Sequence, residues 1–182
     1  MAMPSRHNLW VICLHWLTFI LVLTTVTVVF YADDLQDRGL HNRLMDTHRT
    51  LGVILLALAL WRLLVRLLVT APSLEAPSRL IAALGRLSHA GLYLLLLTAS
   101  VSGWLMTNAA GKPVTLLSLE LPRLVGRDRA LAETLHDGHE LLAYGFLALV
   151  VVHILAALWH QFVVKDDLMR RMSPFAASKK TH

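Results

Sequence analysis

Residues 136–160 read HDGHELLAYGFLALVVVHILAALWH, an apolar segment that contains four histidines. Its length and composition suit a helix that crosses a lipid bilayer, for which roughly 20 apolar residues are needed. An imidazole ring in hydrocarbon is unfavourable unless its nitrogens find partners. His139 and His153 therefore require partners that this segment alone does not supply, and these must come from elsewhere in the chain.

The composition of the whole chain is that of an integral membrane protein. Of its 182 residues 56% are hydrophobic, and its mean hydropathy of +0.59 is too high for an ordinary soluble domain. The single cysteine, Cys13, excludes an intramolecular disulfide and a cysteine-based metal cluster. In so hydrophobic a chain, the formal net charge of +5 indicates basic residues at a membrane face rather than nucleic-acid binding.

Four segments are long and apolar enough to cross a bilayer, and the first is interpreted as a retained span because no cleavage pattern follows it. Prolines and glycines fall between the segments, and the connections are short or moderate in length. The sequence therefore predicts one all-α membrane domain over residues 1–182, an up-down-up-down antiparallel four-helix bundle. The expected helices are 9–31, 44–69, 80–107 and 135–164.

The charges at the helix ends predict the orientation of the bundle. One side carries ten Lys and Arg against three Asp and Glu, and the other carries seven against nine. Because Lys and Arg collect on the cytoplasmic side of membrane proteins, the first side is expected to face the cytoplasm. Both termini would then be cytoplasmic.

The histidines of the predicted spans sort into two depths. His139 and His153 are 14 residues apart, so they share a helix face and lie roughly 21 Å apart. In an antiparallel bundle His48 falls at the depth of His139, and His15 at the depth of His153. Two such pairs would hold two planar cofactors, and haem fits best because its iron takes axial histidines on both faces. Zinc requires about four ligands per site, and neither level provides that many.

Two residues of the second span support a large anionic cofactor. Gly52, one turn after His48, would let a flat macrocycle approach the helix, although glycine also serves close helix packing in membranes. Arg62 follows His48 by 14 residues on the same face, at the inner depth, where a guanidinium would pair with haem propionates. The alternative for Arg62 is a side chain that extends to the lipid headgroups, and this is the favoured interpretation of Arg66.

Several segments resemble bacterial cytochrome b561, the small di-haem membrane cytochrome also called superoxide oxidase. The likeness covers all four predicted spans and is weak in the loops. Its most specific elements are the 14-residue spacing of the two histidines in the last span, the HxxxG motif followed by an arginine pair in the second, and the LHW near the N-terminus. The segments are LHWLTFILVL (14–23), HRTLGVILLALALWRLLVRL (48–67), LSHAGLYLLLL (87–97) and HELLAYGFLALVVVHILAALWHQFVVKDDLMRRM (139–172).

The resemblance implies a protein of the bacterial inner membrane with two haem b groups. It implies axial ligation by His15, His48, His139 and His153, with superoxide oxidised to oxygen outside and ubiquinone reduced near the inner haem. The same fold also serves as the quinone-linked subunit of hydrogenases and formate dehydrogenases, so the fold does not identify the electron donor. A second hypothesis is therefore a cytochrome subunit that links a separate periplasmic dehydrogenase or redox partner to the quinone pool. A third is a haem-free transporter with histidine proton relays, which the matched depths disfavour.

Two further histidines are candidates for the quinone site. His160 lies seven residues beyond His153 on nearly the same face, where it would hydrogen-bond and protonate a quinone head. The alternative for His160 is an interfacial histidine bonded to water. His89 matches a histidine in the family pattern and is a candidate for the same pocket, but it also rivals His15 as the inner axial partner of His153.

The outer loops carry basic residues that would draw an anion such as superoxide toward the outer cofactor. The alternative is that they form no local patch, since the outer side is net acidic. Four tryptophans near the predicted interfaces are interpreted as membrane anchors. The basic residues are Arg49, Lys112, Arg123, Arg127 and Arg129, and the tryptophans are Trp10, Trp61, Trp104 and Trp159.

Overall fold

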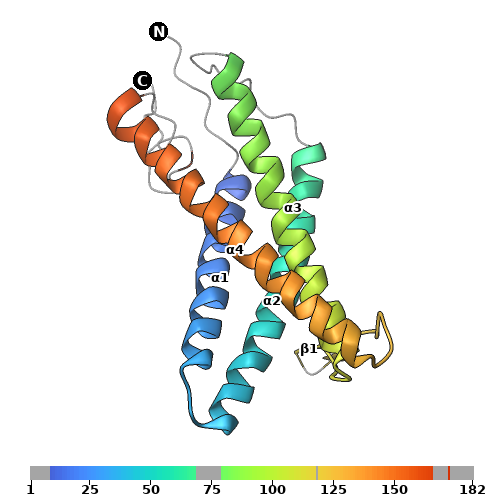
Figure 1. Cartoon of the computed structure of the whole chain (residues 1–182). Coiled ribbons are helices and arrows are strands. Elements are labelled where there is room, and N and C mark those ends of the chain that lie inside the picture. The colour runs from blue at the N-terminus through green and yellow to red at the C-terminus, as the bar shows by residue number, and fades with distance from the viewer. Residues whose placement is uncertain (1–8, 69–78, 118, 166–171, 173–182) are drawn as a thin grey trace.

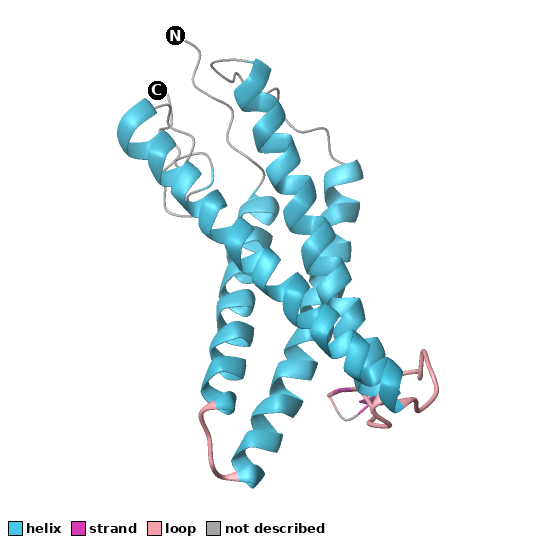
Figure 2. Cartoon of the chain, viewed as in Figure 1, coloured by secondary structure: helices cyan, strands magenta, loops and turns pink. Residues whose placement is uncertain are grey.

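A computed structural model describes residues 9–68, 79–117, 119–165 and 172 of the chain. It confirms the all-α prediction, and each of its four long helices has the length and hydropathy of a membrane span (Figures 1 and 2). The helices are α1 (Leu9–Asp33), α2 (Arg38–Leu68), α3 (Arg79–Ala109) and α4 (Arg129–Trp159), and α4 continues into a π-helical turn, η1 (His160–Val164).

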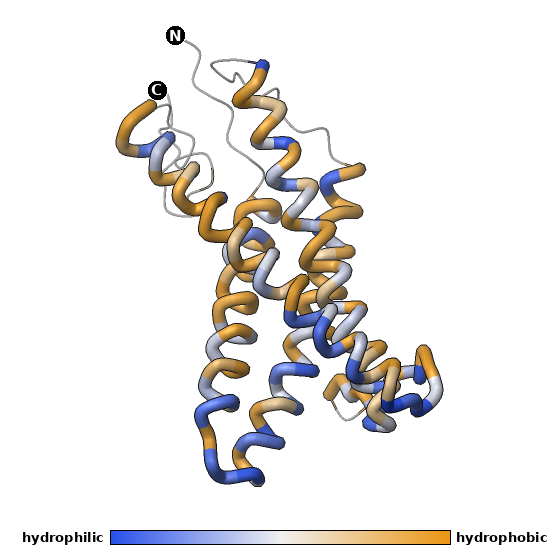
Figure 3. Tube along the Cα trace, in the orientation of Figure 1, coloured by the Kyte–Doolittle hydropathy of each residue, from blue (hydrophilic) through white to orange (hydrophobic). Residues whose placement is uncertain are grey.

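The helices run alternately in opposite directions, as the predicted up-down-up-down bundle requires (Figure 1). Each helix packs against the next along the chain, with the closest packing between α3 and α4 and between α1 and α2. The α1–α2 turn and the α3–α4 connection lie at the same end of the bundle. Figure 3 shows that this end is hydrophilic and that the long middle stretches of the helices are mostly apolar.

Two of the helices begin several residues before the apolar segments from which they were predicted. α2 begins at Arg38 rather than near 44, and α4 at Arg129 rather than near 135. The Asp37 carboxylate accepts hydrogen bonds from two backbone N–H groups in the first turn of α2, at 2.7 and 3.2 Å, and Asp128 accepts one in the first turn of α4, at 3.0 Å. These carboxylates cap polar turns that continue into water, and hydropathy detects only the apolar part of such a helix.

The α3–α4 connection folds back onto the end of α3. It contains a two-stranded antiparallel hairpin of β1 (Thr115–Leu116) and β2 (Leu119–Glu120). The buried Asn108 side chain accepts a hydrogen bond from Leu124 N–H at 2.9 Å and donates one to the Lys112 carbonyl at 3.4 Å. Because Asn108 bonds to residues in the first and the last part of this connection, the loop has a defined path over the end of the bundle that is expected to face outward.

The buried core lies at the middle of the bundle, between the levels of the two expected histidine pairs. Val22, Leu55, Ala59 and Leu96 form it, and Phe146 of α4 packs against it. Phe146 is seven residues from both His139 and His153, which places it about two turns from each. Outside this core, large apolar side chains are exposed along the helices, as expected for a surface that contacts lipid.

Candidate functional site

The structure brings the four expected ligand histidines together in the two predicted pairs. His48 of α2 faces His139 of α4, with 6.2 Å between their ring centroids. His15 of α1 faces His153 of α4, with 6.4 Å between centroids. A third ring stands at the inner level, because His89 of α3 lies 5.4 Å from His153.

The spacing of the two pairs fits a metal ion held between the rings. Two imidazoles that bind one ion from opposite sides, with metal–nitrogen bonds of about 2 Å, place their ring centroids roughly 6 Å apart. The His48–His139 and His15–His153 pairs both match this spacing. The His89 ring is closer to His153 than this arrangement allows. The geometry therefore favours His15 as the partner of His153 and makes His89 a neighbour of that pair.

Hydrogen bonds orient the two outer rings for ligation. His139 Nδ1 lies 2.9 Å from the Ala99 carbonyl oxygen and 3.1 Å from Ser102 Oγ, and His48 Nδ1 lies 3.3 Å from the Thr25 carbonyl oxygen. A carbonyl only accepts, so Nδ1 carries the proton and donates it in both rings. The Nε2 lone pair is then left for a metal, the arrangement usual for ligating histidines.

Arg62 stands beside the inner pair. Its Nη2 lies 3.3 Å from His15 Nδ1, and its guanidinium lies 5.7 Å from the centre of the Tyr93 ring. Arg62 takes part in none of the ion pairs formed by the described residues. A half-buried cation requires a compensating anion, so this position suits a haem propionate better than a side chain extended to the headgroups.

Two glycines shape the space around the outer pair. A Cβ added at Gly52 would meet no atom of the described residues within 4 Å, so this glycine does not serve close helix packing, and the space beside it is open, as a flat cofactor would require. A Cβ added at Gly103 of α3 would lie 3.1 Å from Cε1 of His139. Gly103 could not be identified from the sequence, because its position matters only through a contact between two helices that no local pattern reveals.

Trp104 differs from the other three tryptophans that were interpreted as anchors. Trp10, Trp61 and Trp159 are 75%, 56% and 59% exposed, as suits side chains at a membrane edge. The Trp104 indole nitrogen is buried inside the protein and has no hydrogen-bond partner among the residues that the structure describes. Trp104 is therefore not placed like an anchor at the membrane edge, and the fit of the two levels to haem rests on the paired rings and on Arg62.

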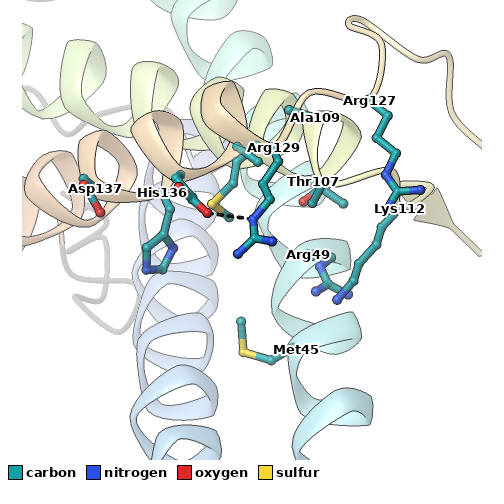
Figure 4. A pocket seen from close by; sticks show the side chains of 13 residues that line it. Met45, Arg49, Thr107, Ala109, Lys112, Arg127, Arg129, His136 and Asp137 are labelled. Carbon is teal, nitrogen blue, oxygen red and sulfur yellow. Dashed lines mark hydrogen bonds and ion pairs between the residues drawn. The ribbon is translucent and has the colours of Figure 1, made fainter.

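A basic cavity of about 490 Å³ opens between α2, α4 and the α3–α4 connection (Figure 4). Two residues of its lining, Arg49 and His136, are one and three residues along the chain from His48 and His139. Four cations and two carboxylates line it, so the charges of this cavity are net positive although the outer side as a whole is acidic. The sequence alone did not show this patch, because α2 and the α3–α4 connection meet only in the fold. The charged lining residues are Arg49, Lys112, Arg127, Arg129, Glu133 and Asp137. The fifth predicted cation, Arg123, pairs with Glu120 at 3.5 Å instead.

Two of the four cations in this cavity have no ion-pair partner within the described part of the chain. Arg49 pairs with Asp46, and Arg129 pairs with Glu133 at 3.0 Å, whereas Lys112 and Arg127 do not form ion pairs there. Gly111 fixes the position of Arg127: it has φ +80°, and a Cβ would lie 3.0 Å from Arg127 Cδ. The backbone turn therefore requires glycine and places an uncompensated charge at the cavity.

His160 begins the π-helical turn that ends α4, about two turns beyond His153. The backbone N–H of Lys165 donates to the His160 carbonyl at 2.7 Å and closes this turn. Single π-helical turns occur frequently at functional sites. The location agrees with the expected depth of His160, and its role toward quinone remains a prediction.

Comparisons with known proteins agree with this geometry. The sequence pattern of the family described as prokaryotic cytochrome b561 matches residues 6–175. Cytochrome b561 homolog 2 of Escherichia coli is 30% identical over 178 residues, covering 93% of this chain and 92% of the relative. The probable superoxide oxidase CybB of Yersinia pestis is 28% identical over 173 residues, covering 94% and 98%. Cytochrome b561 homolog 1 of Escherichia coli is 26% identical over 178 residues, covering 93% and 98%.

Proposed function

We propose that this chain, which belongs to the prokaryotic cytochrome b561 family of haem b membrane electron carriers, oxidises superoxide at the periplasmic side of the membrane. The electrons would then reduce ubiquinone near the haem at the cytoplasmic side. The observation that carries this proposal is the combination of two facing histidine pairs, at 6.2 and 6.4 Å, with a basic cavity lined in part by residues close in the chain to the outer pair. The name of the Yersinia pestis relative, a probable superoxide oxidase, supports the same activity.

In this proposal the chain holds one haem b at each level. His48 and His139 would bind the outer group, and His15 and His153 the inner one. Gly52 leaves room beside the outer group, and Arg62 neutralises a propionate of the inner one. When bound, haem supplies an iron that changes valence by one electron, with a potential that the axial ligands and their hydrogen bonds adjust.

The outer cavity would collect superoxide. Lys112 and Arg127 raise the local concentration of a small anion by attraction, and Arg49 lies next to His48 in the chain. Two superoxide ions each give up one electron and leave as neutral oxygen, which these cations do not retain. The two electrons and two protons convert one ubiquinone to ubiquinol, so charge and atoms balance.

The inner end would hold the quinone. His160 and His89 are the groups proposed to hydrogen-bond the quinone oxygens and to pass protons to them. The excess of Lys and Arg at this end supports a cytoplasmic orientation, so these protons would come from the cytoplasm. The terminal segments that carry many of these charges lie outside the described residues.

The test is superoxide-driven ubiquinone reduction in proteoliposomes that contain only this purified chain. The expected result is ubiquinol formation that added superoxide dismutase abolishes and that a His139→Ala variant lacks. Turnover no higher than in empty vesicles, from protein that holds its haem, would refute superoxide as the sufficient donor. That result would favour a separate periplasmic redox partner instead.

A further inference from the structure

A second cavity, of about 450 Å³, lies between α2 and α3 toward the inner end of the bundle. It involves none of the histidines assigned above. Leu63, Arg66 and Leu67 of α2 line one wall, and Arg86, Ala90, Tyr93, Leu94 and Leu97 of α3 line the other. Apart from its two arginines and one tyrosine, this lining is apolar.

The charged and apolar parts of the lining lie at different depths. Arg66 is two residues from the end of α2 at Leu68, and Arg86 lies about two turns from the start of α3. Leu97 is 11 residues beyond Arg86, about 16 Å nearer the bilayer centre. The two arginines therefore lie nearer the inner end of the bundle than Leu94 and Leu97, which is the order of the headgroup and the acyl chains of a lipid.

The cavity carries positive charge that the described residues do not neutralise. Neither Arg66 nor Arg86 belongs to an ion pair formed within residues 9–68, 79–117 or 119–165. All of the charged residues in the described lining are cations. Leu67 and Leu94 at its wall are 75% and 63% exposed, so the cavity opens on the lipid-facing surface of the bundle.

We propose that this cavity binds one anionic phospholipid, with its phosphate between Arg66 and Arg86 and its acyl chains along the leucines. Basic pockets between membrane helices on the cytoplasmic side bind anionic headgroups in this way. A quinone head is neutral and would offer the two guanidinium groups no opposite charge to bind. An arginine that only extends to the membrane surface requires no cavity with an apolar wall.

The bound lipid would connect α2 to α3 next to the inner histidine level. Tyr93 lies in the cavity wall and also contacts Arg62, and Ala90 of the wall follows His89 in the chain. Occupation of the cavity is therefore expected to stabilise the helix pair that carries Arg62 and His89.

The experiment is native mass spectrometry of the haem-loaded protein from nanodiscs with equal amounts of phosphatidylglycerol and phosphatidylcholine. The expected spectrum shows one retained phosphatidylglycerol per chain, which excess glycerol phosphate does not displace. Retention should fall about tenfold for each arginine removed in Arg66→Gln and Arg86→Gln. The matched control is Arg79→Gln, which removes a cation from the first turn of α3 outside the cavity lining and should retain the lipid.

Three outcomes would overturn the proposal: equal retention of phosphatidylcholine, undiminished retention in the double variant, or ubiquinone retained in place of the lipid. The visible haem spectrum reports whether each variant is folded. If the double variant does not fold, the proposal is tested instead by the thermal unfolding of the unmodified protein with each lipid added. Added phosphatidylglycerol should raise its Tm and phosphatidylcholine should not, and equal shifts would contradict an anionic site.

Discussion

A Gly103→Ala substitution should weaken the outer haem site specifically. The added Cβ would lie 3.1 Å from Cε1 and 3.3 Å from Nδ1 of His139, whereas carbon contacts are optimal at about 3.5–4.0 Å. The ring cannot retreat freely, because its Nδ1 bonds to the Ala99 carbonyl at 2.9 Å and to Ser102 at 3.1 Å. The substitution must therefore displace the ring or break these bonds.

The expected loss of haem affinity follows from the free-energy cost of overpacking a filled site, which is about 1–3 kcal/mol. This corresponds to a loss of roughly 5- to 150-fold in the affinity of the outer site for haem. Gly85→Ala is the matched control on the same helix, since a Cβ there would meet none of the described atoms within 4 Å. Alanine is also the better helix former, so Gly85→Ala should not destabilise α3.

The assay follows haem transfer from the detergent-solubilised protein to an excess of a haem-scavenging protein. In Gly103→Ala half of the haem should leave about tenfold faster than in the unmodified protein, and the other half should leave at the original rate. Gly85→Ala should match the unmodified protein throughout. If Gly103→Ala retains both haems with unchanged rates and spectra, the assignment of His139 as a ligand fixed against α3 is wrong.

Three further variants test the other parts of the site. Arg62→Gln should lower the midpoint potential of one haem by roughly tens of millivolts, because it removes a cation that favours the added electron. Redox titration measures both potentials, and two unchanged values would contradict the placement of Arg62 beside the inner haem. The variant that combines Lys112→Gln and Arg127→Gln should slow superoxide-driven haem reduction about tenfold. Stopped-flow measurements should also show that the rate depends less on salt in this variant. The control Arg123→Gln should match the unmodified protein. His160→Ala should keep its full haem content and superoxide-driven haem reduction but form ubiquinol about 10²-fold more slowly; an unchanged ubiquinol rate would exclude His160 from the quinone site.

The helical architecture and the histidine pairing could be predicted because both follow from periodic rules. Apolar length identifies a membrane helix, and the 14-residue spacing of His139 and His153 identifies two levels on one face. The alternating direction of the helices then assigns His48 and His15 to those levels, although the sequence left His89 as a rival of His15 at the inner level. The ring distances of 6.2 and 6.4 Å agree with this pairing.

Other features could not be predicted because they depend on contacts between distant segments. The outer cavity forms only when Asn108 fixes the path of the loop and brings Lys112 and Arg127 to Arg49. The contact of Gly103 with His139 and the burial of Trp104 likewise depend on what α3 packs against. The starts of α2 and α4 were misplaced because hydropathy does not register a carboxylate cap on a polar turn.

The most direct test of the central claim is the number of haem b groups per chain in the unmodified protein, His48→Ala, His139→Ala and the variant with both changes. If histidines from α2 and α4 bind one haem together, the unmodified protein holds two haems, and each of the three variants retains the same single haem. A variant with both changes that has lost all haem, or either single variant that keeps two, would contradict the pairing on which the proposed electron transfer depends.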